Sequence, residues 1–463
     1  MGGKVALAIV VVALLAALAL FLVRRPTQIA IGQPAATMPG TAPQAAPAPP
    51  PPPPPPPPWT PAQLRDLAAA VGEADAEGLR ASDYHLDALQ QAPSEPRATQ
   101  TALALAHDFA AGRVNRHKFN WYIDYAGPSD DQLRQQIIAA RQQGRLKPWF
   151  ESLLPTSGQY RALRDALAAT PPDDETRRDR IKANMERWRW LPRDFGGGDQ
   201  LYVNLPTYRL DVVEHGQTTA TYKAVIGATD MPTPALSAPV RLVIVNPDWI
   251  LPQSIIRKMH LHPGSSSKYI FSTRPDGTLR VRQKPGAGNA LGKVKIEFPN
   301  KLAIYFHDTP SRSLFGADVR TFSHGCVRVQ NIDALAASLV GNQARFDAAM
   351  ASGQTHGFTP AHPWRANIVY FTLVADADGT LTEVGDPYRQ DEALAARLEG
   401  RLPRTAVISL KPAAPSSAPA RSGAPLPSGV SAPSTPADPV PTQEPPPVQP
   451  ESDHAAPSAN DAG

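Results

Sequence analysis

The sequence predicts an α+β protein with an N-terminal transmembrane helix, a helical domain, a mostly-β domain with a few helices, and Pro-rich tails that we expect to be disordered. Three observations predict this arrangement. Residues 5–23 form an uninterrupted apolar run. Near residue 202 the spacing of apolar residues changes from helical to alternating. Many of the 53 prolines cluster at residues 49–58 and after residue 411, where too few apolar side chains are present to offset the entropy of ordering.

The apolar run at residues 5–23 has the length of a membrane span, since about 20 helical residues cross a bilayer core of about 30 Å. A cleavable signal peptide has a shorter apolar core, of about 7–15 residues. We therefore predict an uncleaved transmembrane anchor at residues 1–25. Lys4 precedes the run and Arg24 and Arg25 follow it, so these charges do not define its orientation.

Residues 26–58 are rich in Pro and Ala and predict a linker. Its ten consecutive prolines at residues 49–58 would extend about 31 Å as polyproline II. Such a segment suits a spacer that holds a domain away from a membrane. A Pro-rich ligand for a small binding module is a compatible alternative.

Residues 59–185 predict a helical domain. Thr60 and Pro61 have the pattern of an N-cap followed by Pro at the first helical position. Leu64, Leu67 and Val71 then fall on one helical face. The acidic residues at 173–175 precede a further helical pattern at 176–190, where a helix N-terminus favours negative charge.

Residues 186–402 predict the mostly-β domain, with a core at about 200–342. A Glu-His-Gly-Gln sequence at 214–217 indicates a turn between two strands. A helix is expected at 332–339 and a late strand at 368–374. Residues 403–463 form a Pro- and Ser-rich tail. The other expected strands are residues 202–205, 210–212, 220–226, 241–245, 294–298 and 303–306.

The charge and cysteine content limit the functions that the chain can have. The net charge is +4, without a dense run of Lys or Arg, which argues against nucleic acid as the main partner. The single cysteine, Cys326, excludes an intrachain disulfide. Its thiol is incidental, intermolecular or reactive, and a lone Cys is more often a small buried hydrophobe than a nucleophile.

The neighbours of Cys326 favour a reactive thiol. A thiol attacks as the thiolate and needs a base or a positive field. His307 lies nineteen positions upstream, at the end of an apolar run, and an enzyme requires its imidazole to meet the sulfur in an accessible groove. Backbone N–H groups at Gly325 and Cys326 could form an oxyanion hole, and Arg328 would favour thiolate or bind a substrate carboxylate. The alternative is a buried Cys beside a core His.

The sequence Ser-His-Gly-Cys-Val-Arg at residues 323–328, with a His nineteen positions before the Cys, resembles the signature of L,D-transpeptidases with a YkuD-type catalytic domain. The resemblance implies that Cys326 is the acylated nucleophile and His307 the general base. It implies that the Asp308 backbone carbonyl orients His307 and that Gly325 lies near the oxyanion. It implies substrate-binding roles for Ser323, His324, Arg328 and Tyr305.

The resemblance covers most of residues 60–398 and is closest to the large periplasmic members, which have a helical scaffold domain. Those members usually carry a small peptidoglycan-binding module before the Met-Glu-Arg-Trp sequence, here at residues 185–188. Only residues 160–180 occupy that space, which is too short for such a module. Residues 259–283 are a candidate lid. The further segments that carry the resemblance are residues 108–114, 184–192, 246–255, 288–292 and 305–310.

The resemblance implies an L,D-transpeptidase that forms 3→3 peptidoglycan cross-links through a thioester. Water as acceptor would make an L,D-carboxypeptidase, and a lipoprotein Lys would make a wall-attaching enzyme. A non-catalytic peptidoglycan-binding scaffold is the alternative of another class. No cofactor is expected. His260 and His262 lack a third metal ligand at a recognisable spacing, so no metal is expected either.

The expected partners are peptidoglycan stem peptides, as donor tetrapeptide and acceptor amine, and the inner membrane through the N-terminal helix. Cell-wall assembly proteins are a further candidate, and nucleic acid is not expected. The expected location is a single pass through the inner membrane, with the catalytic domain in the periplasm. This orientation follows from the catalytic domain, since the flanking charges do not define it.

Overall fold

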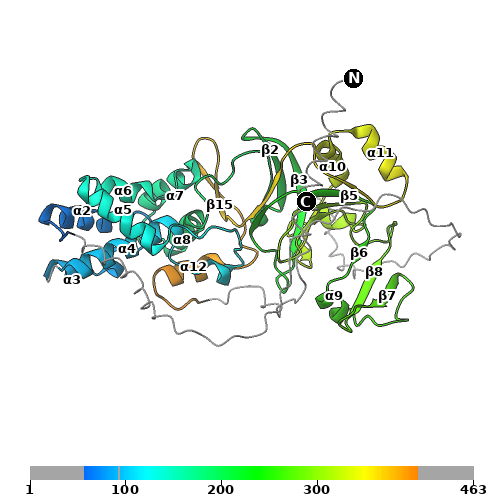
Figure 1. Cartoon of the computed structure of the whole chain (residues 1–463), viewed down its shortest axis with the longest axis horizontal. Helices are drawn as coiled ribbons and strands as arrows, with labels where there is room; N and C mark the ends of the chain where they lie inside the picture. Colours follow the sequence, from blue (N-terminus) through cyan, green and yellow to red (C-terminus); the bar gives the residue numbers. More distant parts are fainter. Residues whose placement is uncertain (1–56, 92–93, 405–463) are drawn as a thin grey trace, which may run out of the picture. The chain divides into compact units, whose positions relative to one another are not determined.

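The computed structural model describes residues 57–91 and 94–404, which form a helical N-terminal region followed by a β-rich region (Figure 1). The fold of these residues is therefore α+β, as the sequence predicts. The expected transmembrane helix, most of the linker and the tail after residue 404 lie outside the described residues. Within the described residues, no helix has both the length and the apolar character needed to cross a membrane.

The helical region begins as its sequence predicts. Thr60 accepts a hydrogen bond from the Gln63 backbone N–H at 3.3 Å, and the Gln63 side chain accepts one from the Thr60 N–H at 3.1 Å. This reciprocal pair caps the first helix, in which Leu67 and Val71 are buried. The helices are α2 (Pro61–Gly72), α3 (Leu86–Gln91), α4 (Glu95–Ala111), α5 (Asp130–Gln142), α6 (Leu146–Ser152), α7 (Gly158–Ala169) and α8 (Glu175–Arg189).

The β-rich region is built on one large sheet of the described residues, with strand order β13-β5-β9-β10-β12-β3-β2-β1-β14-β4 and with β11 paired to β3. Helices α10 (Ile332–Val340) and α11 (Gln343–Ala351) belong to the same region. The strands are β1 (Gln200–Asn204), β2 (Arg209–Glu214), β3 (Gln217–Gly227), β4 (Leu236–Pro239), β5 (Leu242–Val245), β9 (Val294–Glu297), β10 (Phe306–His307), β11 (Thr321–Ser323), β12 (Val327–Val329), β13 (His356–Phe358) and β14 (Arg365–Val369).

Two expected strands differ from the structure. Most of the segment 303–306 is a loop, because the Asn300 side chain accepts hydrogen bonds from the Leu302 and Ile304 N–H groups, both at 3.1 Å, and Ala303 has φ 54°. Only Phe306 joins strand β10. The late strand at 368–374 is divided, since β14 ends at residue 369 and a separate hairpin of β15 (Leu373–Ala375) and β16 (Leu381–Glu383) follows.

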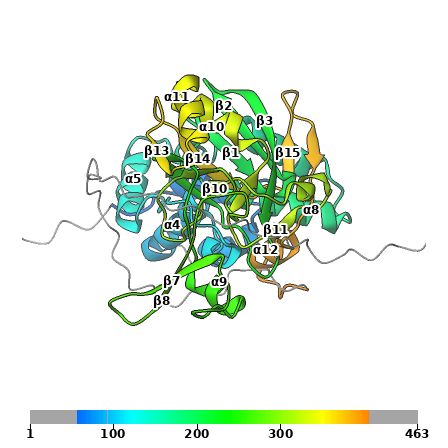
Figure 2. The same cartoon turned by 90° about the vertical axis from the view of Figure 1, so that its right-hand side faces the viewer.

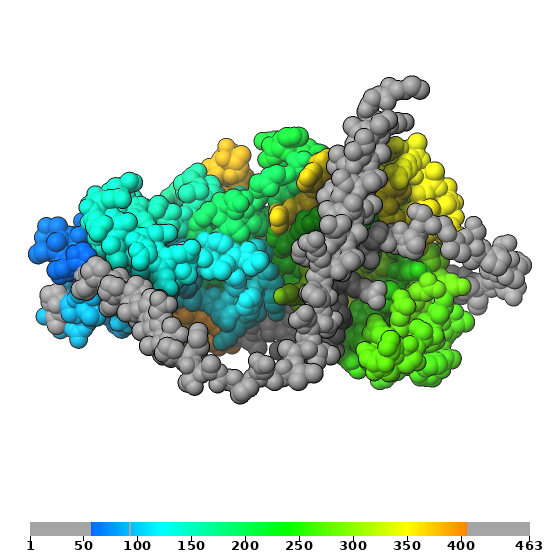
Figure 3. Space-filling model, viewed as in Figure 1, coloured from blue at the N-terminus to red at the C-terminus, as the bar shows by residue number. Residues whose placement is uncertain are grey.

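The candidate lid at residues 259–283 belongs to a small folded insertion. Strands β6 (Trp249–Ile250), β7 (Tyr269–Thr273) and β8 (Leu279–Gln283) form their own sheet. Helix α9 (Gln253–Lys258) packs on it around a separate apolar cluster that includes Leu251 and Val281. Figure 2 shows β7, β8 and α9 grouped at one edge of the large sheet, and Figure 3 shows their green surface. The insertion is therefore more than a loop.

Helix α8 belongs to both apolar cores. Ile181 and Met185 lie in the core of the helical region, whereas Ala183 and Trp190 lie in the core of the large sheet. The Asn184 side chain donates to the Thr372 hydroxyl at 2.7 Å and accepts from the Thr372 N–H at 2.9 Å. The expected domain boundary after residue 185 therefore falls inside a helix that both cores share.

Glu186 organises the junction at the end of α8. The carboxylate is fully buried and accepts from the Arg113 and Val114 N–H groups at 2.6 and 2.7 Å. It also pairs with the Arg189 guanidinium at 2.7 Å, and Arg189 has no exposed side-chain surface. Gly112 lies against this group, because a Cβ there would come within 2.7 Å of the Trp190 ring. One carboxylate thus holds a loop of the helical region against the helix that leads into the sheet.

We expect Glu186→Ala to lower the free energy of unfolding by about 3–5 kcal/mol, because it leaves the Arg189 charge buried without a partner. Urea denaturation followed by circular dichroism measures this loss. Glu175→Ala, at the exposed start of the same helix, is the control and is expected to cost less than about 1 kcal/mol. Equal stabilities for the two variants would contradict the role given to Glu186.

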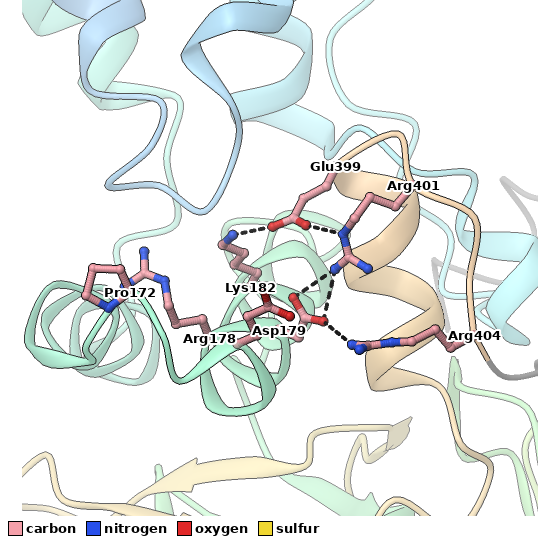
Figure 4. Close-up of a pocket in the computed structure, with 8 residues that line it drawn as sticks. Pro172, Arg178, Asp179, Lys182, Glu399, Arg401 and Arg404 are labelled. Carbon is pink, nitrogen blue, oxygen red and sulfur yellow. Dashed lines mark hydrogen bonds and ion pairs between the residues drawn. The ribbon is translucent and has the colours of Figure 1, made fainter.

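A cavity of about 450 Å³ lies between α8 and the segment that follows α12 (Asp391–Leu398). Most of its charged side chains pair with one another (Figure 4). Arg401 bonds Glu399 at 2.5 Å and Asp179 at 3.0 Å, and Lys182 also pairs with Glu399. These ion pairs hold the segment that follows α12 against α8.

Candidate active site

Two neighbouring strands bring the His307 and Cys326 segments side by side. Strand β10 pairs in parallel with β12, so that Phe306 lies opposite Val327 and His307 opposite Arg328. Phe306 and Val327 are fully buried in the core of the sheet. Since side chains alternate along a strand, His307 and Arg328 lie on the opposite face. Cys326 lies one residue before β12 and contacts the Tyr305 side chain, so the pairing of β10 with β12 brings the segments of Cys326 and His307 together.

His307 is held as a neutral imidazole. Its side chain is buried, and Nδ1 lies 2.5 Å from the Asp308 carbonyl oxygen, the contact that the family resemblance implies. Burial, together with the charges of Arg328 and Lys295, lowers the pKa of His307 to about 3. A neutral ring that donates from Nδ1 leaves Nε2 as an acceptor. This is the tautomer that a general base needs.

The Asp308 side chain is itself fixed by the turn before β9. Its Oδ2 accepts from the Lys293 N–H at 2.8 Å, and Oδ1 lies 2.8 Å from the Arg312 guanidinium. Gly292 leaves room for this carboxylate, since a Cβ there would lie 2.3 Å from Oδ2. The Gly-containing sequence at 288–292 thus supports the residue whose carbonyl contacts His307.

Cys326 is a half-buried neutral thiol. Its Sγ donates to the Ala303 carbonyl at 3.7 Å. Burial raises the pKa of Cys326 to about 11, against the opposing effects of Tyr305, Lys295 and Arg328. Among the described residues, no hydrogen bond joins the sulfur to His307. Catalytic hydrogen bonds are often long in a free enzyme and tighten in its complex, so the two residues on neighbouring segments are candidates for proton transfer.

The turn before Cys326 leaves one backbone donor open. Gly325 has φ 108°, a conformation that favours glycine. Ser323 Oγ accepts from the Gly325 N–H at 3.1 Å and donates to the Cys326 carbonyl at 2.5 Å. The Gly325 N–H is thereby engaged within the turn. The Cys326 N–H has no acceptor among the described residues and is the available oxyanion donor.

Comparisons with known proteins match both regions of the chain. Residues 198–354 match the L,D-transpeptidase catalytic domain family, YkuD, and residues 56–167 match the Scaffold domain family. Residues 198–354 of this chain are therefore similar to a YkuD-type L,D-transpeptidase catalytic domain. A Haemophilus influenzae protein described as "Putative L,D-transpeptidase" is 26% identical over 315 residues, which are 61% of this chain and 63% of that protein. The match therefore spans less than two thirds of that relative.

Solved L,D-transpeptidases are also similar to parts of the chain. L,D-transpeptidase 1 of Mycobacterium tuberculosis is 17% identical, with 37% of this chain and 61% of that chain covered and a TM-score of 0.19. A structure of LdtMt1 in complex with imipenem is 19% identical, covering 37% and 59%, with a TM-score of 0.21. The enzyme of Mycobacterium smegmatis is 15% identical, covering 36% and 58%, with a TM-score of 0.21.

Two cations flank the imidazole of His307. Lys295 of β9 lies opposite His307, as Arg328 does on the other side. Lys295 Nζ lies 4.2 Å from the centre of the Tyr305 ring and 2.5 Å from Glu297. Arg328 is half-buried, and no carboxylate pairs with it among the described residues. A partly desolvated cation without a counter-ion favours an anionic ligand, so this face suits a substrate carboxylate.

Sequence reasoning did not assign Lys295 or Trp249 to the site. Lys295 reaches it only through the register of β9 with β10. Trp249 comes from the insertion and lies beside the Tyr305 side chain, which in turn contacts Cys326. The Tyr-x-His spacing at 305–307 places both rings on one face, with centroids 5.6 Å apart.

His324 lies at the rim of the candidate site. It is exposed, and burial of part of the ring together with the charges of Lys258 and Arg328 lowers its pKa. Lys258 of α9 pairs with Asp230, in the loop after β3, at 3.2 Å. The structure thus gathers Ser323, His324, Gly325 and Arg328 around Cys326. Among residues 57–91 and 94–404, no cluster of three or more His, Cys, Asp or Glu residues suits a metal ion.

The raised pKa of Cys326 predicts the reactivity of its thiol in the free protein. We expect alkylation by iodoacetamide to be slow at pH 7 and to rise about tenfold per pH unit toward a plateau near pH 11, since only the thiolate reacts. Mass spectrometry of the intact protein gives the rate, and the single cysteine makes the label specific.

Lys295→Gln should lower the alkylation rate at a given pH, because loss of the cation raises the pKa of Cys326 further. The same change in the helical region, Lys118→Gln, is the control and should leave the profile unchanged. A plateau already reached at pH 7 in the parent protein would show a preformed thiolate and would contradict the neutral resting state.

Proposed function

We propose that this chain is an L,D-transpeptidase that forms 3→3 cross-links between peptidoglycan tetrapeptide stems, with Cys326 as nucleophile and His307 as general base. The observation that carries the proposal is the parallel pairing of β10 with β12. It brings His307, a neutral imidazole whose Nδ1 contacts the Asp308 carbonyl, to the segment that carries the half-buried Cys326 thiol. The matched catalytic domain supports this reaction type.

The first acyl transfer begins when the thiol attacks the carbonyl between the L-centre of the stem's diamino acid and the terminal D-Ala. His307 Nε2 takes the proton as the S–C bond forms, and the oxyanion accepts from the Cys326 N–H. The protonated imidazole then gives its proton to the leaving D-Ala amine. The product is a thioester on Cys326, and the C–N bond to D-Ala is broken.

The cations that flank His307 explain why the substrate activates the site. In the free protein, Arg328 and Lys295 help to lower the pKa of His307, which makes it a weak base. A substrate carboxylate bound between the two cations would offset their field and raise the basicity of the imidazole. Substrate binding and activation of the thiol would then be one event.

The candidate enzymes differ in the acceptor of the second acyl transfer. A side-chain amine of a neighbouring stem attacks the thioester, loses a proton to His307 and gives the 3→3 cross-link. Water would give an L,D-carboxypeptidase, and a lipoprotein Lys would give a wall-attaching enzyme, through the same acyl-enzyme. The lid-like insertion of residues 249–283 borders the site through Trp249 and is placed to influence which acceptor enters.

The location is part of the same proposal. The apolar run at residues 5–23 would anchor the chain in the inner membrane, with residues 26–58 as a spacer. The catalytic domain would face the periplasm, where stem peptides are present. A membrane-bound fraction that is released by protease added to spheroplasts would support this location.

The test is a product analysis with the full chain and a purified disaccharide-tetrapeptide. We expect free D-Ala together with dimers whose mass equals two substrates minus one D-Ala. The disaccharide-tripeptide, which lacks the leaving D-Ala, is the control and should give no product alone. Tripeptide without dimers would establish the carboxypeptidase, and no product at all would favour the non-catalytic scaffold.

A further inference from the structure

We propose that Thr233 and Tyr388 are positioning residues that aim the Cys326 N–H at the oxyanion. The inference rests on the proposed function. It concerns the turn at residues 323–326, called here the nucleophile turn. Four buried hydrogen bonds connect its Gly325–Cys326 peptide to the loop after β3, which carries Thr233, and connect that loop to Tyr388.

The Gly325 carbonyl is the group that these bonds hold. It accepts from the Thr233 hydroxyl at 2.8 Å. In a planar trans peptide the C=O and the following N–H point in opposite directions. A carbonyl that is pinned toward Thr233 therefore directs the Cys326 N–H away from the loop, toward the side on which the sulfur reacts.

The Thr233 hydroxyl donates its proton to the Gly325 carbonyl. Thr233 Oγ1 accepts from the Gly227 N–H at 2.8 Å. Because a backbone N–H can only donate, the hydroxyl's own proton is left for the Gly325 carbonyl. Thr233 is 1% exposed, so water does not compete for these bonds.

Tyr388 secures the same loop from the other side. Its hydroxyl accepts from the Thr233 N–H at 3.0 Å and donates to the Gly227 carbonyl at 2.8 Å. A Cβ at Gly227 would lie 2.2 Å from the Met231 carbonyl, which shows how closely the loop folds back on β3. Tyr388 thus clamps both ends of the loop that carries Thr233.

Tyr388 has a rigid support of its own. Its N–H donates to the Tyr370 hydroxyl at 2.9 Å, and the two rings stack with centroids 5.5 Å apart. The Tyr370 hydroxyl also bonds Asp386. Tyr388 lies beyond residues 198–354, the matched catalytic domain, so a segment outside that domain completes its nucleophile turn.

The experiment compares two reactions of the same sulfur. Acylation by imipenem passes through an oxyanion, whereas alkylation by iodoacetamide does not. In the full-length Thr233→Val protein we expect acylation to fall about 10–100-fold, with alkylation at pH 9 within about twofold of the parent. Thr233→Ser restores the hydroxyl and should recover most of the acylation rate. With peptide substrate, kcat should fall while KM changes little.

The ratio of the two rates separates positioning from a merely structural role. Loss of both rates in parallel, or an unchanged acylation rate, in a folded Thr233→Val protein would overturn the proposal. If that variant does not fold, Tyr388→Phe, which keeps the stacked ring, decides by the same ratio and should lose acylation selectively. A parent protein that imipenem does not acylate would instead refute the proposed function itself.

Discussion

Cys326→Ala is expected to abolish both D-Ala release and dimer formation, with a loss of at least about 10³-fold in rate, because no other described side chain can form the thioester. Cys326 is the single cysteine of the chain, and Ser323 Oγ is engaged within the turn. Product analysis by liquid chromatography and mass spectrometry measures the loss. The imipenem adduct should disappear with it.

The folded state of the Cys326→Ala protein is the internal control. The side chain is half-buried and loses only a thiol, so we expect a change in unfolding free energy of less than about 1.5 kcal/mol. An inactive protein with near-parental stability would show that the substitution removes a catalytic step and leaves the fold intact. Dimers that persist in the variant would show that Cys326 is not the nucleophile.

His307→Gln is the second change with a large expected effect. Loss of the general base should lower kcat by about 10²–10⁴-fold, since glutamine occupies similar space but does not accept a proton at neutral pH. His117→Gln, in the helical region and outside the site, is the matched control and should retain parental activity. A His307→Gln protein with more than about a tenth of the parental rate would argue against His307 as the base.

The same variant tests the burial of the neutral imidazole. The folded-state pKa of His307 is about 3, below the ordinary value of about 6.5. Between these values the unfolded chain binds a proton that the folded chain does not, so acid favours unfolding in this window. The parent should lose on the order of 4 kcal/mol more than His307→Gln as the pH falls from 6.5 to 3. Parallel stability curves for the two proteins would contradict the lowered pKa.

The catalytic sheet and the helical region are connected by buried charge as well as by apolar contact. Arg187, which has no exposed side-chain surface, pairs with Asp391 at 2.6 Å, and Asp391 accepts from the Thr372 hydroxyl at 2.7 Å. These residues come from α8, from the start of α12 and from the bend between β14 and β15. The C-terminal segment that carries Tyr388 is therefore anchored on the helix that both cores share.

Local sequence determined the features that depend on neighbours along the chain. The capped start of α2 follows from the Thr60-Pro61 pair and Gln63. The hairpin turn between β2 and β3 follows from His215 and Gly216, both of which have positive φ. The six adjacent residues at 323–328 indicated the nucleophile turn, because a turn brings its own side chains together. Strand 303–306 was predicted wrongly, since a single side chain, Asn300, replaces the strand's hydrogen bonds.

The sequence by itself thus determined the α+β class and the identity of the residues in the nucleophile turn. Only the tertiary structure decided what surrounds them. Lys295 reaches His307 through strand register. Thr233 bonds Gly325, which lies 92 positions away along the chain, and Tyr388 bonds Gly227, which lies 161 positions away. Such contacts produce no periodic pattern in the sequence, because they depend on which strands pair and on which segments the loops bring together. The pKa values of Cys326 and His307 were decided in the same way, since burial and charges from other strands set them.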